Sequence, residues 1–395
     1  MSLDLIKVVA QVGDMVARLK AGSRERQEHL QFALDTLHKA TDLDYLQKKI
    51  ASSKTTWLVA GLVDGLSQHY KPPLLPPEFT VIATDGSHID VDRHKSTRCY
   101  LINIGAAVLD YGTRPNARLN SFPQLYSEPE ELVITPAKGR EQPVEGVLLG
   151  IKRSVEECCQ LSKLAAELPS GSSTLALLDG SLILWGLEAY PEFVTEALLD
   201  KGFLPYLEDI RRLNSDKRLA LASYISFPRS TDVVNVLRVA VCPHEAPDCD
   251  RYCPNKAKDC DKVAGVQDRE LFIALLASGE RSALFMTQSS IVQKRYGGHK
   301  VYFFYLRVGD EIARVEIPQW VAKDEGLLNL THVLVLDQCQ RGLGYPVALS
   351  EAHEKAVVTT ADREEFWRVV ESLMVEEKMP TPTSAKSFSK RTRWV

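Results

Sequence analysis

Two short apolar runs that each lead into Asp-Gly-Ser constrain the fold of this 395-residue chain more than any other feature. They are TVIATDGSH at 80–88 and LALLDGS at 175–181. Short apolar runs of this kind predict buried strands, so Asp85 and Asp179 are expected at the ends of two strands of one sheet. Gly86 is expected to let the chain turn beside the first acid. The alternative interpretation is that each Asp-Gly pair is an ordinary turn.

The overall composition is that of a soluble globular protein, with 45% apolar and 25% charged residues. The net charge of −4 gives no global basic field of the kind that marks many nucleic-acid-binding proteins. No segment reaches the ~18 uninterrupted apolar residues of a membrane span. Asp4 and Lys7 interrupt the first apolar run, which is not a signal peptide. We therefore expect a cytoplasmic protein without membrane contact.

Three regions follow from the pattern along the chain. Residues 1–70 have apolar residues at helical spacing and predict a helical N-terminal arm, which packs against the rest or forms a dimer. A cluster of four prolines between 72 and 77 predicts a stiff connector into one α/β domain over 71–378. The Pro-, Ser-, Thr- and Lys-rich tail, 379–395, is predicted to be a disordered basic segment.

The order of elements in the α/β domain is that of a nuclease-type mixed sheet flanked by helices. After the first strand, two more extended runs precede a helix and the strand that ends at Asp179. The later pattern predicts helices, strands and a β-hairpin. The predicted strands are 99–109, 117–126, 219–227, 301–308, 312–317 and 332–336. The predicted helices are 144–168, 182–199 with a break at Pro191, 203–213, 268–277, 345–358 and 363–375.

A third carboxylate is expected from the helix predicted over 144–168. Phosphodiester hydrolysis by two metal ions needs several carboxylates around ions ~4 Å apart, and oxygen ligands suit Mg²⁺ and Mn²⁺. Glu157 shares its helix face with Leu161 and Leu164, which must point at the sheet. Glu156 falls instead on a face of basic residues. We favour Glu157, with Glu156 as the alternative, because a carboxylate on an apolar face is costly unless it is paired or metal-bound.

A Tyr and a His near the C-terminus are further candidates. Pro346 suits the first turn of a helix, and Tyr345 comes directly before it. His353 lies one turn after Leu349, on the face that should point inward. A single His on such a face is more often a core residue than a catalyst.

Half of the eight cysteines fall in one insert, residues 242–260. In a reducing compartment this crowding favours a metal over disulfides. The spacing Cys-x6-Cys-x3-Cys-x6-Cys differs from a standard zinc ribbon, so Zn²⁺ and an iron–sulfur cluster are both candidates, with His244 as a spare ligand. The alternative is an exposed loop with free thiols. The four candidate ligands are Cys242, Cys249, Cys253 and Cys260.

Taken together, these motifs resemble those of the NurA nuclease family. The resemblance rests on TDGSH at 84–88, LLDGSL at 177–182, SYISFPRS at 223–230 and GYPxxLxxAH at 344–353. Each motif is short, but the ordered set is specific and spans residues 79–358. The four-cysteine insert is the main departure from the family pattern.

The resemblance implies an RNase H-like fold, a homodimer and Mn²⁺-dependent DNA cleavage, with Mg²⁺ as the alternative metal. The family's activities are 5′→3′ exonuclease and single-strand endonuclease. The family's partner is a HerA-type hexameric ATPase, which moves DNA through the nuclease dimer during end resection. By position, the family's site residues correspond to Asp85, Glu157, Asp179, Tyr345 and His353.

The resulting hypothesis is metal-dependent hydrolysis of DNA. Asp85, Glu157 and Asp179 would hold Mn²⁺, His353 would bind a second ion or assist proton transfer, and Tyr345 would position a phosphate. DNA contacts would come from local basic residues and would weaken steeply with salt. The candidates for these contacts are Arg229, Lys294, Arg295 and Lys300.

Two other functions compete with this hypothesis. An actin-like ATP phosphotransferase also places an Asp-Gly turn after its first strand, but no Gly-rich phosphate loop accompanies it here. A non-catalytic DNA-binding or adaptor subunit of the ATPase would keep the fold alone. That function predicts a damaged set of acids, whereas Asp85, Asp179 and His353 are all present.

Overall fold

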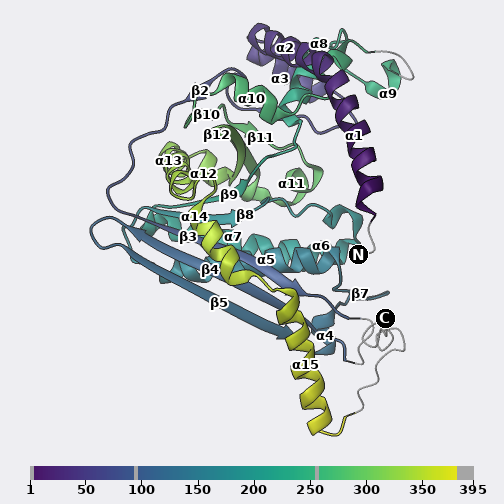
Figure 1. Cartoon of the computed structure of the whole chain (residues 1–395). Coiled ribbons are helices and arrows are strands. Elements are labelled where there is room, and N and C mark those ends of the chain that lie inside the picture. Colours follow the sequence, from purple (N-terminus) through teal and green to yellow (C-terminus); the bar gives the residue numbers. More distant parts are fainter. Residues whose placement is uncertain (1–3, 93–96, 254–257, 380–395) are drawn as a thin grey trace. The chain divides into compact units, whose positions relative to one another are not determined.

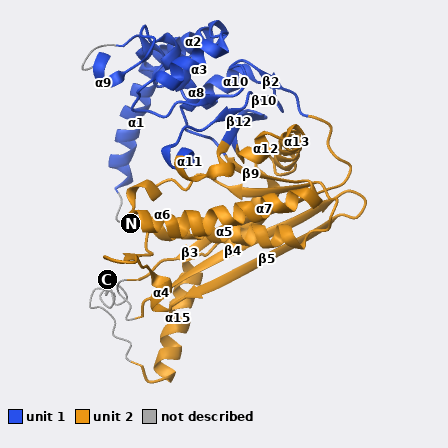
Figure 2. Cartoon of the chain, turned by 180° about the vertical axis from the view of Figure 1, so that it is seen from behind, with its two compact units in different colours: residues 1–72, 226–293, 302–315 blue, residues 73–225, 294–301, 316–395 orange. Residues whose placement is uncertain are grey.

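The computed structural model describes residues 4–92, 97–253 and 258–379, and the chain divides into two compact units (Figures 1 and 2). Unit 1 takes residues 1–72, 226–293 and 302–315. Unit 2 takes residues 73–225, 294–301 and 316–395. Each unit therefore draws on segments that are far apart in the sequence. In the described part of the chain, no helix has the length and apolar character needed to cross a membrane.

Five neighbouring strands run through unit 2 in the spatial order β9-β8-β3-β4-β5 (Figure 1). The strands β3, β4 and β5 form an antiparallel meander, while β8 lies parallel to β3 and β9 lies parallel to β8. The predicted order of three strands, a helix and a further strand is confirmed, with α5 as the helix. The bounds are β3 Phe79–Ile89, β4 Tyr100–Tyr111, β5 Asn116–Tyr126, α5 Val147–Glu167, β8 Thr174–Asp179 and β9 Leu219–Ile225.

Two glycines show that α5 and α14 (Val347–Ala356) cover opposite faces of this sheet. A Cβ on Gly105 of β4 would lie 2.0 Å from the carbonyl oxygen of Ala352 in α14. A Cβ on Gly86 of β3 would lie 2.7 Å from Oε1 of Glu157 in α5. Gly105 pairs with Asp85 in the ladder, so Gly86, the next residue, faces the other way. Each glycine thus lets one helix approach its face of the sheet closely.

The remaining elements of unit 2 connect and flank these strands. The helix α7 packs against α5, and α13 contacts β8, β9 and α14. They are α4 Pro129–Leu132, β6 Val133–Ile134, β7 Gln142–Pro143, η1 Leu187–Ala189, α6 Glu192–Thr195, η2 Glu196–Phe203, α7 Leu204–Lys217, η4 Gly297–His299, α12 Gln319–Ala322, α13 Glu325–Arg341 and α15 Thr360–Glu376.

The expectation for Asp85 and Gly86 was wrong in one respect. Asp85 is not at the end of its strand, because β3 continues to Ile89, and Gly86 lies within the strand rather than in a turn. The glycine is needed for space and not for backbone conformation, since a Cβ there would meet both Glu157 and Arg153 of α5. Asp179, by contrast, does end β8, as expected.

Two predicted elements also differ from the structure. Residues 332–336 were expected as a strand but belong to α13, which is buried on nearly every side. Such a helix shows the same continuous apolar run as a buried strand. Residues 182–199 were expected to be helical with a break at Pro191. The break is confirmed, because α6 begins directly after Pro191, but before it regular structure is limited to the short η1, after Gly186 in a left-handed conformation (φ 95°).

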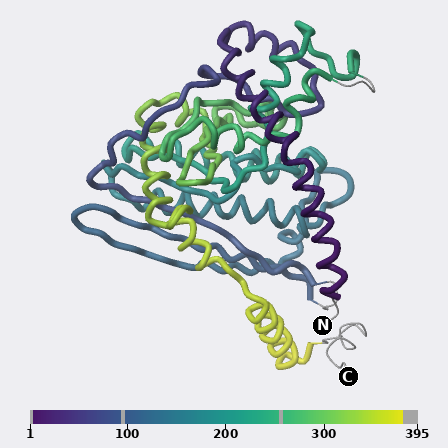
Figure 3. Tube along the Cα trace, turned by 45° about the horizontal axis from the view of Figure 1, so that its top comes forward, coloured from purple at the N-terminus to yellow at the C-terminus, as the bar shows by residue number. Residues whose placement is uncertain are grey.

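Unit 1 is built from the N-terminal helices and the chain around α8. Its core includes Leu37, Leu46, Val233 and Phe272. The purple and green segments of the trace in Figure 3 that make up this core are thus distant in sequence. The elements are α1 Leu5–Ala21, α2 Ser23–Lys39, α3 Leu43–Ser52, β1 Gly61–Leu62, β2 His69–Tyr70, α8 Asp232–Val241, α9 Cys249–Tyr252, η3 Asp259–Val263, α10 Asp268–Leu275, β10 Arg281–Ser282 and β11 Phe285–Met286. The division between the units passes through α11 Ser290–Arg295, β12 Val301–Val308 and β13 Glu311–Pro318.

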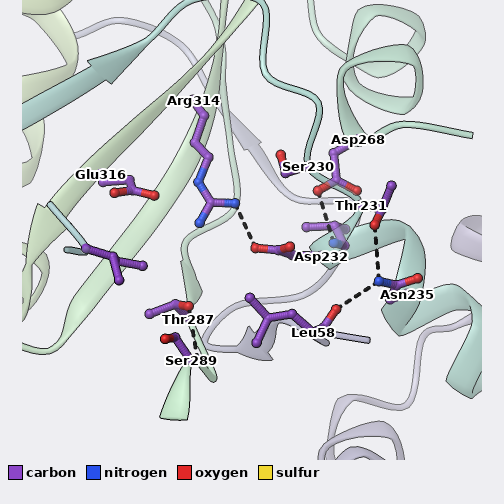
Figure 4. Close-up of polar contacts among 12 residues, drawn as sticks. Leu58, Ser230, Thr231, Asp232, Asn235, Asp268, Thr287, Ser289, Arg314 and Glu316 are labelled. Atoms are coloured by element: carbon purple, nitrogen blue, oxygen red, sulfur yellow. Dashed lines mark hydrogen bonds and ion pairs between the residues drawn. The ribbon is translucent and has the colours of Figure 1, made fainter. Parts of the chain in front are cut away.

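A buried charged network joins α8, α10 and the β12–β13 hairpin in unit 1 (Figure 4). Arg314 donates to Asp232 at 2.8 Å, and both side chains are largely buried. Asp268, at the start of α10, accepts from the hydroxyl of Tyr305 and from the backbone N–H groups of Val233 and Val234. Burial, and secondly the charge of Asp232, raise the pKa of Asp268 to about 6. The predicted hairpin around residues 309–310 is therefore an integral part of this core.

Candidate functional site

Asp85 and Asp179 lie side by side on neighbouring parallel strands. The register pairs Thr84 of β3 with Leu178 of β8, and each acid is the next residue of its strand. Neighbouring strands are about 4.8 Å apart, so the two backbones hold the carboxylates close together. Each carboxylate accepts a hydrogen bond from the backbone N–H of the glycine that follows it, at 2.8 Å for Asp85 and 3.0 Å for Asp179.

Glu157 approaches this pair from α5. Its side chain is buried, whereas Glu156 is partly exposed and pairs with Lys152 at 2.6 Å. The Nε of Arg153, one turn earlier, donates to Oε1 of Glu157 at 3.0 Å. Burial raises the pKa of Glu157 to about 8; Arg153 lowers it, and the charges of the two aspartates raise it further. The helical phase inferred from the sequence predicted that Glu157, and not Glu156, faces the sheet, and the structure confirms this orientation.

His353 meets Asp85 from the opposite face. Its Nδ1 lies 2.7 Å from Oδ2 of Asp85. In a hydrogen bond to an ionised carboxylate the ring nitrogen is the donor, and in the neutral tautomer with the proton on Nδ1 the other nitrogen, Nε2, is an acceptor. The helix that carries His353 is fixed at its C-terminal end, where Asn103 of β4 donates to the carbonyl of Ala356 at 2.9 Å and the hydroxyl of Ser87 donates to the same oxygen. The ring itself is well exposed to solvent.

Tyr345 completes the group from the loop before α14. Its hydroxyl lies near Asp179 and lowers the pKa of that carboxyl, and the ring packs edge-on against Tyr224 of β9 at a centroid distance of 5.5 Å. Burial raises the pKa of Tyr345, as does the charge of Asp179, so the phenol stays protonated at neutral pH. Asp179 is exposed at the end of β8, but the surrounding protein removes part of the hydration of its carboxylate. This partial desolvation raises the pKa of Asp179.

The donor set fits a hard divalent cation. Burial is the main cause of the raised pKa of Glu157, and the charges of Asp85 and Asp179 raise it further, so a cation near these acids would relieve part of this repulsion. As they stand, Glu157 pairs with Arg153 and Asp85 with His353, while Tyr345 lies near Asp179. Consistent with this, no three His, Cys, Asp or Glu side chains within the described residues are arranged to hold an ion. An ion would have to compete with these partners.

A comparison of the sequence with models of known protein families identifies the family. A family model for the NurA domain matches residues 79–358, more than half of the chain. The chain belongs to the NurA family. This is a family of nucleases, and all five site residues expected from the resemblance lie inside the matched region. A search of the curated proteins finds no match.

Four residues that support this NurA site were not singled out from the sequence. Arg153 could have been found, because it precedes Glu157 by four positions on the helix, where side chains meet. Gly105, Ser87 and Asn103 left no local signal. They matter because they contact α14, which is about 250 residues away in the sequence.

The basic residues expected at DNA are divided between the two units. Arg229 is exposed and belongs to unit 1, whereas Lys294, Arg295 and Lys300 belong to unit 2. Arg295 is already paired with Asp200, at 2.6 Å, and with Glu192. These two carboxylates neutralise Arg295 and make it a poor candidate for a phosphate contact. The basic tail from 380 onward lies outside the described residues.

The four cysteines of the insert surround one small cavity of about 20 Å³ in unit 1. Cys242 ends α8, Cys249 and Cys253 lie one turn apart at α9, and Cys260 lies in η3. All four are free thiols. They belong to the described residues, in which no three ligands are arranged for an ion. The expectation of Zn²⁺ or an iron–sulfur cluster stays a prediction.

Proposed function

We propose that this NurA-family chain is a metal-dependent DNA nuclease that cleaves phosphodiesters as a 5′→3′ exonuclease and a single-strand endonuclease. The observation that carries the proposal is the gathering of Asp85, Glu157 and Asp179 with His353 and Tyr345. These side chains come from two strands, a helix on each face and one loop. Two acids on neighbouring strands whose charges act on a third, buried acid are more typical of a functional site than of a purely structural one.

The proposed metal ligands are Asp85, Glu157, Asp179 and His353, and the proposed ion is Mn²⁺, with Mg²⁺ as the alternative. When bound, such an ion lowers the pKa of water and offsets negative charge that builds on the phosphate. The protein's part is to hold the carboxylates on rigid strands and to keep Glu157 buried. Arg153 would neutralise Glu157 until the ion arrives.

His353 and Tyr345 are suited to proton handling and positioning. Because Asp85 accepts a hydrogen bond from Nδ1–H of His353, the Nε2 atom is left free to accept or return a proton at a reacting oxygen. Tyr345 remains a neutral donor and can orient a phosphate oxygen beside Asp179. Neither role depends on movement of the sheet.

The wider assignments are part of the same proposal. The strand order, an antiparallel meander joined to two parallel strands, supports the RNase H-like fold that the family resemblance implies. The resemblance also supports a homodimer and a HerA-type hexameric ATPase that would deliver DNA during the resection of double-strand breaks. Arg229, Lys294 and Lys300 remain the proposed phosphate contacts.

Removal of metal provides the direct test. Protein stripped with EDTA should cleave neither single-stranded DNA nor duplex ends, and Mn²⁺ should restore cleavage by at least about a hundredfold. Separate labels on the 5′ and 3′ ends of the DNA distinguish stepwise removal of nucleotides from internal cuts. Cleavage that persists undiminished in EDTA, or no cleavage with either Mn²⁺ or Mg²⁺, would contradict the proposal.

A second metal is proposed for the cysteine insert. Arg238 lies against the cluster, with Nη2 3.9 Å from Sγ of Cys260, and its guanidinium stacks over Trp57 at 4.2 Å. The positive charge of the Arg238 guanidinium at this position would stabilise thiolates.

We expect about one zinc, or the iron of one cluster, per purified chain by elemental analysis. The double variant Cys249→Ser/Cys253→Ser should lose it, while the buried Cys339→Ser should not. Metal-free wild-type protein with four titratable thiols at the insert would contradict this.

A further inference from the structure

One large aromatic side chain beside the acids has no role in the site described so far. Trp185 is 48% exposed, which is unusual for a residue that is normally well buried. It lies six positions after Asp179, in the loop that connects the Asp-Gly-Ser unit to η1. An exposed indole at this position calls for an explanation, because water contact with its ring is unfavourable.

The indole is held in place by the serine of the second Asp-Gly-Ser unit. The Nε1–H of Trp185 donates to Oγ of Ser181 at 3.1 Å. The hydroxyl of Ser181 donates in turn to Oε2 of Glu316 at 2.8 Å and accepts from the backbone N–H of Ile183 at 3.0 Å. Glu316 is fully buried and also accepts from the backbone of Leu182. The ring is therefore fixed, and its polar atom is satisfied within the protein.

The position of the ring relative to the acids can be followed along α5. Gly186, the neighbour of Trp185, lies against the first turns of α5: its Cβ position is 3.8 Å from Val147 and 3.9 Å from Ile151. Glu157 is six residues further along the same helix, a rise of about 9 Å. Gly186, the neighbour of Trp185, thus lies against α5 about 9 Å along the helix axis from Glu157, the length of a few stacked nucleotides at about 3.4 Å each.

We propose that Trp185 is a stacking platform for a base of the DNA strand that enters the acidic site. The inference rests on the proposed function and adds a substrate-binding residue to it. A fixed indole whose N–H is satisfied internally has only its ring surface left to offer, and every base presents a matching π-face. Such contacts hold single strands without reading their sequence. Ser181 is then a positioning residue, which explains why the motif continues past its acid.

The test measures DNA binding separately from cleavage. In an Asp85→Asn background that leaves the DNA intact, labelled oligo-dT is titrated by fluorescence anisotropy. We expect Trp185→Ala to weaken binding about tenfold and Trp185→Phe, which keeps a ring, by no more than about threefold. Phe122→Ala, which removes another exposed aromatic from the edge strand β5 of the same unit, should leave the affinity unchanged. Melting temperatures establish that each variant is folded.

Intrinsic fluorescence gives a second readout. DNA should quench the tryptophan emission of the Asp85→Asn protein, and Trp185→Phe should remove most of this quenching. Ser181→Ala should leave the melting temperature near its original value but weaken both quenching and affinity, and Ser181→Thr, which keeps the hydroxyl, should restore them.

The outcomes separate this inference from the proposed function. If wild-type protein cleaves DNA but the Trp185→Ala variant binds oligo-dT as tightly as the protein that keeps Trp185, the stacking role is wrong while the nuclease proposal stands. A Trp185→Ala variant with normal DNA affinity but an altered oligomeric mass would assign the ring to a protein contact and would equally overturn the inference. If wild-type protein neither binds nor cleaves DNA, both proposals fail.

Discussion

Asp85→Asn should reduce the cleavage of single-stranded DNA in Mn²⁺ by at least about a thousandfold while the protein remains folded. Asparagine has nearly the same volume and still offers an oxygen to the N–H of Gly86. It lacks the negative charge that attracts a cation and that orients His353. A metal ion contributes several kcal/mol to such a reaction, and about 4 kcal/mol corresponds to a thousandfold in rate. Initial rates of release of labelled product measure the effect.

Two matched controls sharpen this experiment. Asp110→Asn removes a carboxylate from β4 that bonds only the hydroxyl of Thr80 in the same sheet, and it should leave the rate within about twofold. Glu157→Gln should match the loss at Asp85, whereas Glu156→Gln, one residue away on the same helix, should not. Full activity in a folded Asp85→Asn protein would refute the assignment of the site. If Glu156→Gln and Glu157→Gln reduced the cleavage rate equally, burial would not be what distinguishes the functional Glu from its neighbour.

Gly105→Ala should destabilise the protein by about 1–3 kcal/mol or more and should also abolish most of its activity. The new Cβ would lie 2.0 Å from the backbone oxygen of Ala352 and 2.4 Å from the backbone nitrogen of Ala356. Backbone atoms cannot rotate away as a side chain can, so α14 must move. That helix carries His353, and its displacement would break the contact with Asp85. Urea denaturation and the rate of DNA cleavage measure the two effects.

Gly150→Ala is the corresponding control. Gly150 lies inside α5, and a Cβ there meets nothing within 4 Å. Replacing a helical glycine with alanine should raise the free energy of unfolding by up to about 1 kcal/mol and leave cleavage unchanged. If Gly105→Ala proved as stable and active as Gly150→Ala, the close packing of α14 on β4 would not be what positions His353.

The elements that the sequence predicted well are those with a clear local pattern. The order of the strands around α5 and the phase of Glu157 on that helix followed from apolar periodicity alone. The helix at 332–336 was mistaken for a strand because α13 is buried on nearly every side, and burial removes the polar residues that reveal helical periodicity. The loop at 182–186 was missed because side-chain hydrogen bonds hold it, from the indole of Trp185 to Ser181 and from Ser181 to Glu316. These bonds leave no local turn pattern in the sequence.

By itself, the sequence predicted which residues are candidates for the chemistry: two Asp-Gly-Ser units, a Glu on the apolar face of a helix, and a Tyr and His in one motif. It also determined the family, because the motifs occur in a fixed order. Only the tertiary structure decided how the acids meet. Parallel register sets Asp85 beside Asp179, while Gly86 and Gly105 admit one helix to each face. A glycine's missing side chain becomes informative only when the atom that occupies its space is known.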